Sequence, residues 1–198
     1  MNINQAKLKK LAKITKGLFD VFFWVSVVTG IVGVIGFIAI YFIPDSVFVI
    51  TNSQKGRMSI SLDGMINFKI DPEVYNNLSI KPLLNAIFPM VTVISIMLMV
   101  LLQQVRLILK TVSNDIPFEK SNPKRLLIIG ITLLIGSFAV KYVMGMVALT
   151  LVSLLKLKDI DINFSPDGTM IFNGLIVIVL AGVFQYGNYL QEEYDATL

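Results

Sequence analysis

The sequence predicts an all-α membrane protein, a single domain of four transmembrane helices over residues 1–198, with both termini cytoplasmic and small extracytoplasmic β-hairpins. Three observations lead to this prediction. Of the 198 residues, 55% are hydrophobic and 15% are charged, whereas about 25% are charged in ordinary soluble domains. The basic residues mostly flank the apolar segments instead of lying within them. The apolar residues gather in four long blocks, which are 21–43, 83–102, 126–155 and 171–184.

The block lengths define the spans. A helix needs about 20 apolar residues to cross a bilayer core about 30 Å thick, and the first three blocks reach that length. The fourth block reaches it when Gln185, Tyr186 and Asn188 lie in the interfacial layer. The predicted spans are 21–43, 83–104, 126–150 and 170–189, with outer loops 44–82 and 151–169, a cytoplasmic loop 105–125 and a cytoplasmic tail 190–198.

The charge distribution predicts the orientation. An even number of spans places both termini on one side, and segments 1–19, 103–125 and 185–198 then share that side. These segments carry ten Lys and Arg residues, against six in the opposite segments 44–82 and 156–170. Because cytoplasmic loops are enriched in Lys and Arg, and five of the ten precede the first span, we expect the termini in the cytoplasm.

Residues 6–18 predict a basic amphipathic helix before the first span. At 100° per residue, four apolar side chains gather on one side and four lysines lie on the other. Such a helix can lie on an anionic inner leaflet. The same pattern also fits a calmodulin-binding or nucleic-acid-binding helix, but its position next to a span favours the membrane surface.

Two outer segments, 58–70 and 160–172, alternate apolar and polar residues around an Asp-Gly pair. This arrangement is a strong hairpin signal. Because an isolated hairpin is only marginally stable in water, we expect the two hairpins to share one sheet, with 46–51 as a further strand. The sheet would be either a sensing cap or a simple cover for the loops.

Lys141 is the only charged residue well inside an apolar block, and an intramembrane charge is a functional candidate. Ser137, one helical turn earlier, raises the alternative of a Ser–Lys hydrolase dyad. A lysine this close to the outer end of a long block can instead extend to the interface. The chain has no oxyanion-hole signature, no Cys and no His, so we expect no enzymatic activity and no cofactor or metal.

Two further features concern packing and transport. Gly30, Gly33 and Gly36 form a ridge of small residues on the first span, which favours close helix packing over the alternative of a substrate groove. No span carries a mid-depth Asp or Glu, although coupled carriers usually need such groups. Coupled transport is therefore disfavoured, while an accessory role in transport or efflux stays open.

The polar, proline and basic residues of the loop before the third span are those expected where a helix begins at the membrane surface. Asn122 is a favourable N-cap, and Pro123 suits the first position of a helix. Lys124 and Arg125 would then lie at the inner headgroups, with Phe118 in the interfacial layer. This interpretation requires no partner.

The same loop and the C-terminus also carry two motifs. Pro117, Phe118, Asn122, Arg125, Leu126 and Gly130 follow the pattern P-F-x3-N-x2-R-L-x3-G. The ending follows G-x2-L-Q-x-E-x-D-x-T plus an aliphatic residue, at Gly187, Leu190, Gln191, Glu193, Asp195, Thr197 and Leu198. From its first span to its last residue, the chain resembles an uncharacterised family of bacterial four-span membrane proteins, known as a domain of unknown function. Ala196 departs from the larger aliphatic residue usual there.

Members of that family are often encoded beside a small Cro/C1-type helix-turn-helix regulator. The resemblance therefore implies a multi-pass protein of a bacterial cytoplasmic membrane that holds or informs a transcription regulator. The candidate docking residues are Pro117, Phe118, Asn122 and Arg125 in the loop, with Gln191, Glu193 and Asp195 in the tail. Alternatively, the chain is a transport or efflux accessory, or a small-solute membrane protein.

The charges of the two motifs are complementary, with Lys124 and Arg125 opposite the acidic residues of the tail. We expect the tail to fold back on the loop, or loop and tail to form one docking surface. The expected partners are the lipid bilayer and the regulator, with self-association left open and no direct contact with nucleic acid.

Overall fold

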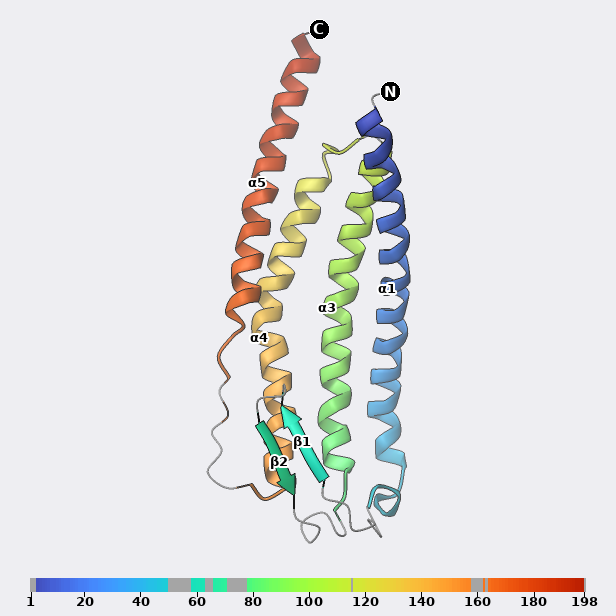
Figure 1. The fold of residues 1–198 in the computed structure, drawn as a ribbon, viewed down its shortest axis with the longest axis vertical. Coiled ribbons are helices and arrows are strands. Elements are labelled where there is room, and N and C mark those ends of the chain that lie inside the picture. Colours follow the sequence, from blue (N-terminus) through green and yellow to red (C-terminus); the bar gives the residue numbers. More distant parts are fainter. Residues whose placement is uncertain are drawn as a thin grey trace.

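The computed structural model describes residues 3–49, 58–62, 66–70, 78–114, 116–157, 162 and 164–197. Within these residues, four long helices lie side by side and alternate in direction (Figure 1). All four are long and apolar enough to cross a membrane, which is the architecture of a multi-pass membrane protein. The helices are α1 (Ile3–Phe42), α3 (Lys81–Ser113), α4 (Asn122–Leu154) and α5 (Gly168–Thr197).

The helices form an open row. α1 packs on α3, α3 on α4 and α4 on α5, so α1 and α5 are the two edges of the row (Figure 1). A single layer has little interior, and the largest fully buried side chains are Ile40, Asn122 and Ser137. Large apolar side chains such as Trp24 and Phe138 are about 60% exposed. Soluble proteins rarely expose so much apolar surface, whereas lipid tails solvate it as well as a protein interior does.

The helices extend beyond the predicted spans. With 30 to 40 residues in the shortest and longest, they measure about 45–60 Å, more than the bilayer core of about 30 Å. The predicted loop 105–125 is mostly helical, since α3 ends at Ser113 and α4 begins at Asn122. The predicted tail 190–198 continues α5 as far as Thr197. Hydropathy detects only the apolar part of each helix, which explains the difference.

Residues 6–18 are the first part of α1 and not a separate surface helix. α1 runs without a break from Ile3 to Phe42, so this basic segment continues along the axis of the span (Figure 1). Where the segment meets the span, an ion pair of 2.7 Å joins Lys16 and Asp20, and pairs four residues apart support a helix. The expectation of a helix lying flat on the leaflet is therefore wrong.

The glycines of the first span face α3. A Cβ added at Gly33 would lie 2.6 Å from Thr92 Oγ1 and 3.3 Å from the carbonyl oxygen of Phe88, and one at Gly36 would meet the Phe88 ring. Such distances leave no room for a side chain. The prediction that these glycines allow two helices to pack closely is confirmed.

One two-stranded antiparallel sheet lies at the end opposite the termini (Figure 1). It consists of β1 (Met58–Leu62) and β2 (Ile66–Ile70), with Met58 opposite Ile70 and Leu62 opposite Ile66. These strands lie within the first predicted hairpin, whose turn at Asp63-Gly64 falls outside the described residues. The strand expected at 46–51 is replaced over most of its described part by η1 (Asp45–Phe48), a 3₁₀-helix.

The second predicted hairpin, at 160–172, is wrong. Gly168 begins α5, and the preceding Asp167 acts as its cap, since Asp167 Oδ1 accepts a hydrogen bond of 3.1 Å from the Met170 N–H. An Asp-Gly pair suits both a hairpin turn and a helix start. Here the long apolar run after Gly168 favours the helix.

α5 is displaced along α4 toward the end that carries the termini. Its start lies beside the middle of α4, where the Asp167 N–H donates to the Ser137 carbonyl at 3.2 Å. Further along, Gly174 packs on Gly130, and a Cβ at Gly174 would lie 3.0 Å from the carbonyl oxygen of Gly130. The last turns of α5 therefore extend past the start of α4 (Figure 1).

Candidate functional site

Asn122 is the buried centre of the loop between α3 and α4. Its side chain is 0% exposed, and its amide nitrogen donates to Thr111 Oγ1 at 2.8 Å and to the Pro117 carbonyl at 2.9 Å. One side chain thus holds the end of α3 and the middle of the loop against the start of α4. The N-cap of α4 is Ser121, so the prediction that Asn122 caps the helix is wrong. Its amide turns inward to the loop instead.

Arg125 continues this network. Its Nη1 donates to Asn122 Oδ1 at 2.8 Å and to the Leu107 carbonyl at 3.2 Å. Its Nη2 lies 3.5 Å from Glu119 Oε1, which also accepts a hydrogen bond of 2.6 Å from Ser121 Oγ. The side chain of Arg125 is only 16% exposed. The predicted pairing of Arg125 with the acidic tail is therefore wrong, because its guanidinium is engaged within the loop.

Phe118 joins the loop to α5. The centroid of its ring lies 5.6 Å from that of Phe184, with the two planes inclined by 38°. Gly187 faces the same ring, and a Cβ at Gly187 would lie 3.3 Å from it. Aromatic pairs at this spacing are favourable. The loop therefore rests on α5 through an aromatic contact.

Two polar contacts complete the connection. Asn188 Nδ2 donates to the Glu119 carbonyl at 3.5 Å, and Lys120 Nζ lies 2.8 Å from Glu192 Oε1. The Lys120–Glu192 pair is largely exposed, and such pairs contribute about 0–1 kcal/mol. We name this surface the loop–tail platform, which consists of residues 116–121 with Phe184, Gly187, Asn188 and Glu192.

The three candidate residues of the tail lie on the last turns of α5. Gln191 and Glu193 are exposed, and Asp195 is helical with a side chain outside the description. Because α5 stays helical to Thr197, the tail stands beside the loop and does not fold back on it. Among the side chains that the structure describes, Glu192 makes the ion pair between tail and loop.

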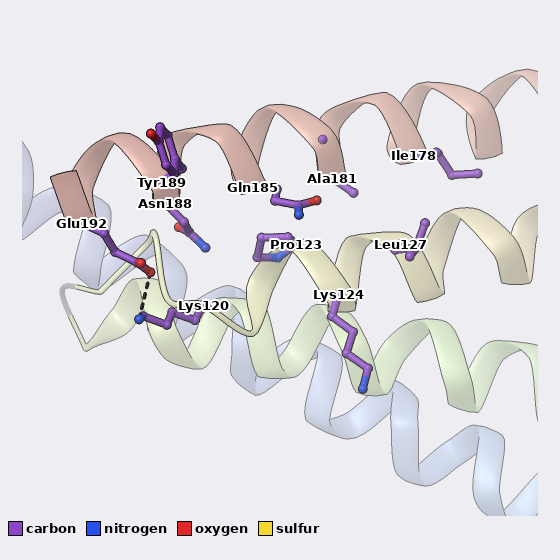
Figure 2. Close-up of a pocket in the computed structure, with 11 residues that line it drawn as sticks. Lys120, Pro123, Lys124, Leu127, Ile178, Ala181, Gln185, Asn188, Tyr189 and Glu192 are labelled. Carbon is purple, nitrogen blue, oxygen red and sulfur yellow. Dashed lines mark ion pairs between the residues drawn. The ribbon is translucent and has the colours of Figure 1, made fainter.

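A cavity of about 600 Å³ lies between the start of α4 and the second half of α5 (Figure 2), and it shares Lys120, Asn188 and Glu192 with the platform. Leu127, Ile178 and Ala181 line its inner part, while Lys124 and Gln185 lie nearer the platform. We name it the α4–α5 cavity.

Ser137 and Lys141 have separate partners. Ser137 Oγ donates to the Leu134 carbonyl at 2.6 Å, and Lys141 Nζ lies 3.9 Å from Asp167 Oδ2. Within the part of the chain that the structure describes, no hydrogen bond joins the two side chains. Lys141 therefore lies beside the residue that caps α5, and the geometry gives no support to a nucleophile–base dyad.

The sequence patterns indicated no functional role for Asn188 and only a negative charge for Glu192. Phe184, Asn188 and Glu192 follow one another at intervals of four residues, which places them on one helical face. That spacing could have predicted a surface of α5 directed at the loop. Thr111 lies eleven residues before Asn122, and no local pattern relates the two.

The comparisons with known proteins agree with the two motifs. A family model described as a protein of unknown function, DUF2975, matches residues 71–198. The match includes the whole platform but neither α1 nor the β1–β2 hairpin, so it is shorter than the expected resemblance from the first span onward. No curated protein and no solved structure matches the chain. Since the match covers more than half of the sequence, the chain belongs to the DUF2975 family.

Proposed function

We propose that this chain is a regulatory protein of a bacterial inner membrane, which binds a small cytoplasmic helix-turn-helix regulator on the loop–tail platform. The observation that carries the proposal is the buried network of Asn122, which fixes the loop against α3 and α4, while Phe118 and Glu119 join the loop to α5. A simple connection between two spans needs no such network. A preordered surface loses less conformational entropy when a partner binds, which suits a docking site.

The arrangement of the chain supports the cytoplasmic orientation. Both termini and the platform lie at one end of the row, and the β1–β2 hairpin lies at the other (Figure 1). The segments at the terminal end hold ten of the Lys and Arg residues, against six in the opposite loops, and this bias favours the cytoplasmic side. The hairpin end would then face outward and be available for an input signal.

The exposed surface near the platform has the composition of a protein-binding site. Ile116 and Phe118 are 53% and 47% exposed, and Tyr189 on α5 is 60% exposed. Lys120 and Glu193 add charges of both signs around them. Aromatic and apolar groups within a polar rim are typical of interfaces between proteins, whereas a nucleic-acid surface is predominantly basic.

A pull-down from native membranes in mild detergent tests the proposal. The intact chain is compared with a chain that ends at Tyr189, and the bound proteins are identified by mass spectrometry. We expect a small DNA-binding protein to be recovered with the intact chain and to be lost with the truncated chain. The truncation removes Glu192 and with it the ion pair to the loop. A Glu193→Lys protein, changed at an exposed position, should also recover less of it.

The matched control is Val47→Lys, an exposed change at the opposite end of the molecule, which should leave recovery unchanged. Recovery of only transporter subunits, or only copies of this chain, with both the intact and the truncated protein would contradict the proposal. The transport-accessory alternative would then lead. Solute flux in proteoliposomes would test that alternative, since a regulator should show none.

A further inference from the structure

We propose that the α4–α5 cavity binds an anionic phospholipid whose headgroup carries free hydroxyls, the chemistry of phosphatidylglycerol. This inference does not depend on the regulator. The cavity lies beyond the point where Gly130 and Gly174 bring the two helices close together. Gly130 and Gly174 hold α4 and α5 in backbone contact, whereas a Cβ at Gly182, two turns further along α5, would meet nothing within 4 Å. Most of the residues that line this space of about 600 Å³ are exposed, so it is a groove at the surface of the row that lipid or water fills.

The lining of the cavity changes from apolar to polar along the helices. Leu127, Ile178 and Ala181 line the inner part, as Figure 2 shows, and they offer no hydrogen bonds. At the platform end the lining includes Lys120, which is paired with Glu192, and the exposed Lys124. A phospholipid has the same sequence of groups along its length, with acyl chains next to an anionic phosphate. Basic residues beside an apolar span attract such headgroups.

Asn188 indicates which headgroup fits. The residue is 9% exposed, and its Oδ1 is buried without a hydrogen-bond partner. Its Nδ2 donates to the Glu119 carbonyl at 3.5 Å, which favours this orientation of the amide, since the reverse orientation would bring two oxygens together. Buried polar atoms are nearly always paired. Asn188 lines the cavity, and in Figure 2 its side chain extends from α5 toward α4, so a donor in the occupant would pair the unsatisfied oxygen.

The headgroup must therefore both accept and donate hydrogen bonds. A phosphate diester accepts from lysine but has no donor of its own, so it cannot satisfy Asn188 Oδ1. The carboxylate of Glu192, which is paired with Lys120, is a second acceptor on the same wall. A glycerol headgroup provides hydroxyls for both acceptors and keeps the phosphate for the lysines. This combination separates phosphatidylglycerol from simple anions.

Native mass spectrometry of the purified full chain in mild detergent tests the site with defined lipids. Phosphatidylglycerol is compared with phosphatidylmethanol, which has the same charge but no headgroup hydroxyl, and with zwitterionic phosphatidylcholine and phosphatidylethanolamine. We expect phosphatidylglycerol to bind about tenfold more tightly than phosphatidylmethanol, since one satisfied buried acceptor corresponds to about that factor. Phosphatidylcholine should bind most weakly.

Three variants locate the binding. Gly182→Leu adds a side chain at an open position in the cavity and should abolish the preference for phosphatidylglycerol. Gly17→Leu, the control, adds the same side chain in open space on α1 and should retain this preference. Lys124→Gln, a change at an exposed position, should weaken the binding of all anionic lipids. Asn188→Leu should remove only the advantage of phosphatidylglycerol over phosphatidylmethanol. The amount of folded protein is measured for each variant, and its lipid binding is corrected for any loss of folded protein.

Several results would overturn the proposal. Equal binding of all four lipids, tighter binding of phosphatidylethanolamine than of phosphatidylglycerol, or an unchanged preference in the Gly182→Leu protein would each do so. Glycerol phosphate or inorganic phosphate that competes as well as intact lipid would identify a soluble phosphate ligand instead. A dimer lost in the Gly182→Leu protein would identify a second copy of the chain as the occupant.

Discussion

Asn122→Ala is expected to lower the free energy of unfolding by about 3 kcal/mol, because it removes three hydrogen bonds worth about 0.5–1.5 kcal/mol each, one buried and two part-buried, and leaves their partners unpaired. The side chain is fully buried and joins Thr111, Pro117 and Arg125. The loop should therefore lose its fixed shape before the spans separate. Unfolding in detergent micelles by titration with dodecyl sulfate, followed by circular dichroism, measures the change.

The matched control is Asn114→Ala. Asn114 is exposed at the end of α3, and changes at exposed positions usually stay within about 0.5 kcal/mol. Equal stabilities for the two alanine proteins would show that the Asn122 network does not hold the loop. The proposed docking surface would then lack its structural basis.

Gly130→Leu is expected to lower the free energy of unfolding by about 3 kcal/mol, at the upper end of the cost of overpacking. A Cβ at Gly130 would already lie 2.5 Å from Ile178 Cγ1 and 2.9 Å from the carbonyl oxygen of Gly174. The second atom belongs to the backbone, so a rotamer change cannot relieve the contact, and α5 has to move away from α4. The same dodecyl sulfate titration detects this.

Gly182→Leu is the control on the facing helix. It adds the same side chain where a Cβ meets nothing within 4 Å, and replacing a helical glycine contributes up to about 1 kcal/mol of stability through helix propensity. This protein should therefore be as stable as the wild type or slightly more so. A similar loss of stability in both leucine variants would mean that the loss does not arise from the close approach of α4 and α5 at Gly130.

The four spans could be predicted from sequence because the bilayer imposes a minimum apolar length on any spanning helix. The glycine ridge at Gly30, Gly33 and Gly36 could be predicted for a similar reason, since close packing in lipid requires small residues at helical spacing. The strands β1 and β2 follow from alternation around a turn signal. In each case the constraint acts within a short stretch of chain.

The wrong predictions concern choices that a short stretch cannot decide. Asp167 suits both a turn and a helix cap, and the structure uses it as a cap. Arg125 could pair with any nearby acid, and its partner Glu119 is selected by the fold of the loop. The inward turn of Asn122 depends on Thr111, a residue of the preceding helix. Such contacts arise from tertiary structure.

The orientation of the platform is the claim on which the proposed function depends most directly, and labelling of single cysteines tests it. The chain contains no cysteine, so an introduced thiol is the only reactive one. Ile116→Cys on the platform and Val47→Cys in η1 change residues that are 53% and 68% exposed, at opposite ends of the row. Each protein is treated with a membrane-impermeant maleimide in intact spheroplasts. We predict labelling of the Val47→Cys protein at once and of the Ile116→Cys protein only after permeabilisation. Labelling of the Ile116→Cys protein in intact spheroplasts would contradict the account, because the platform would then face away from any transcription regulator.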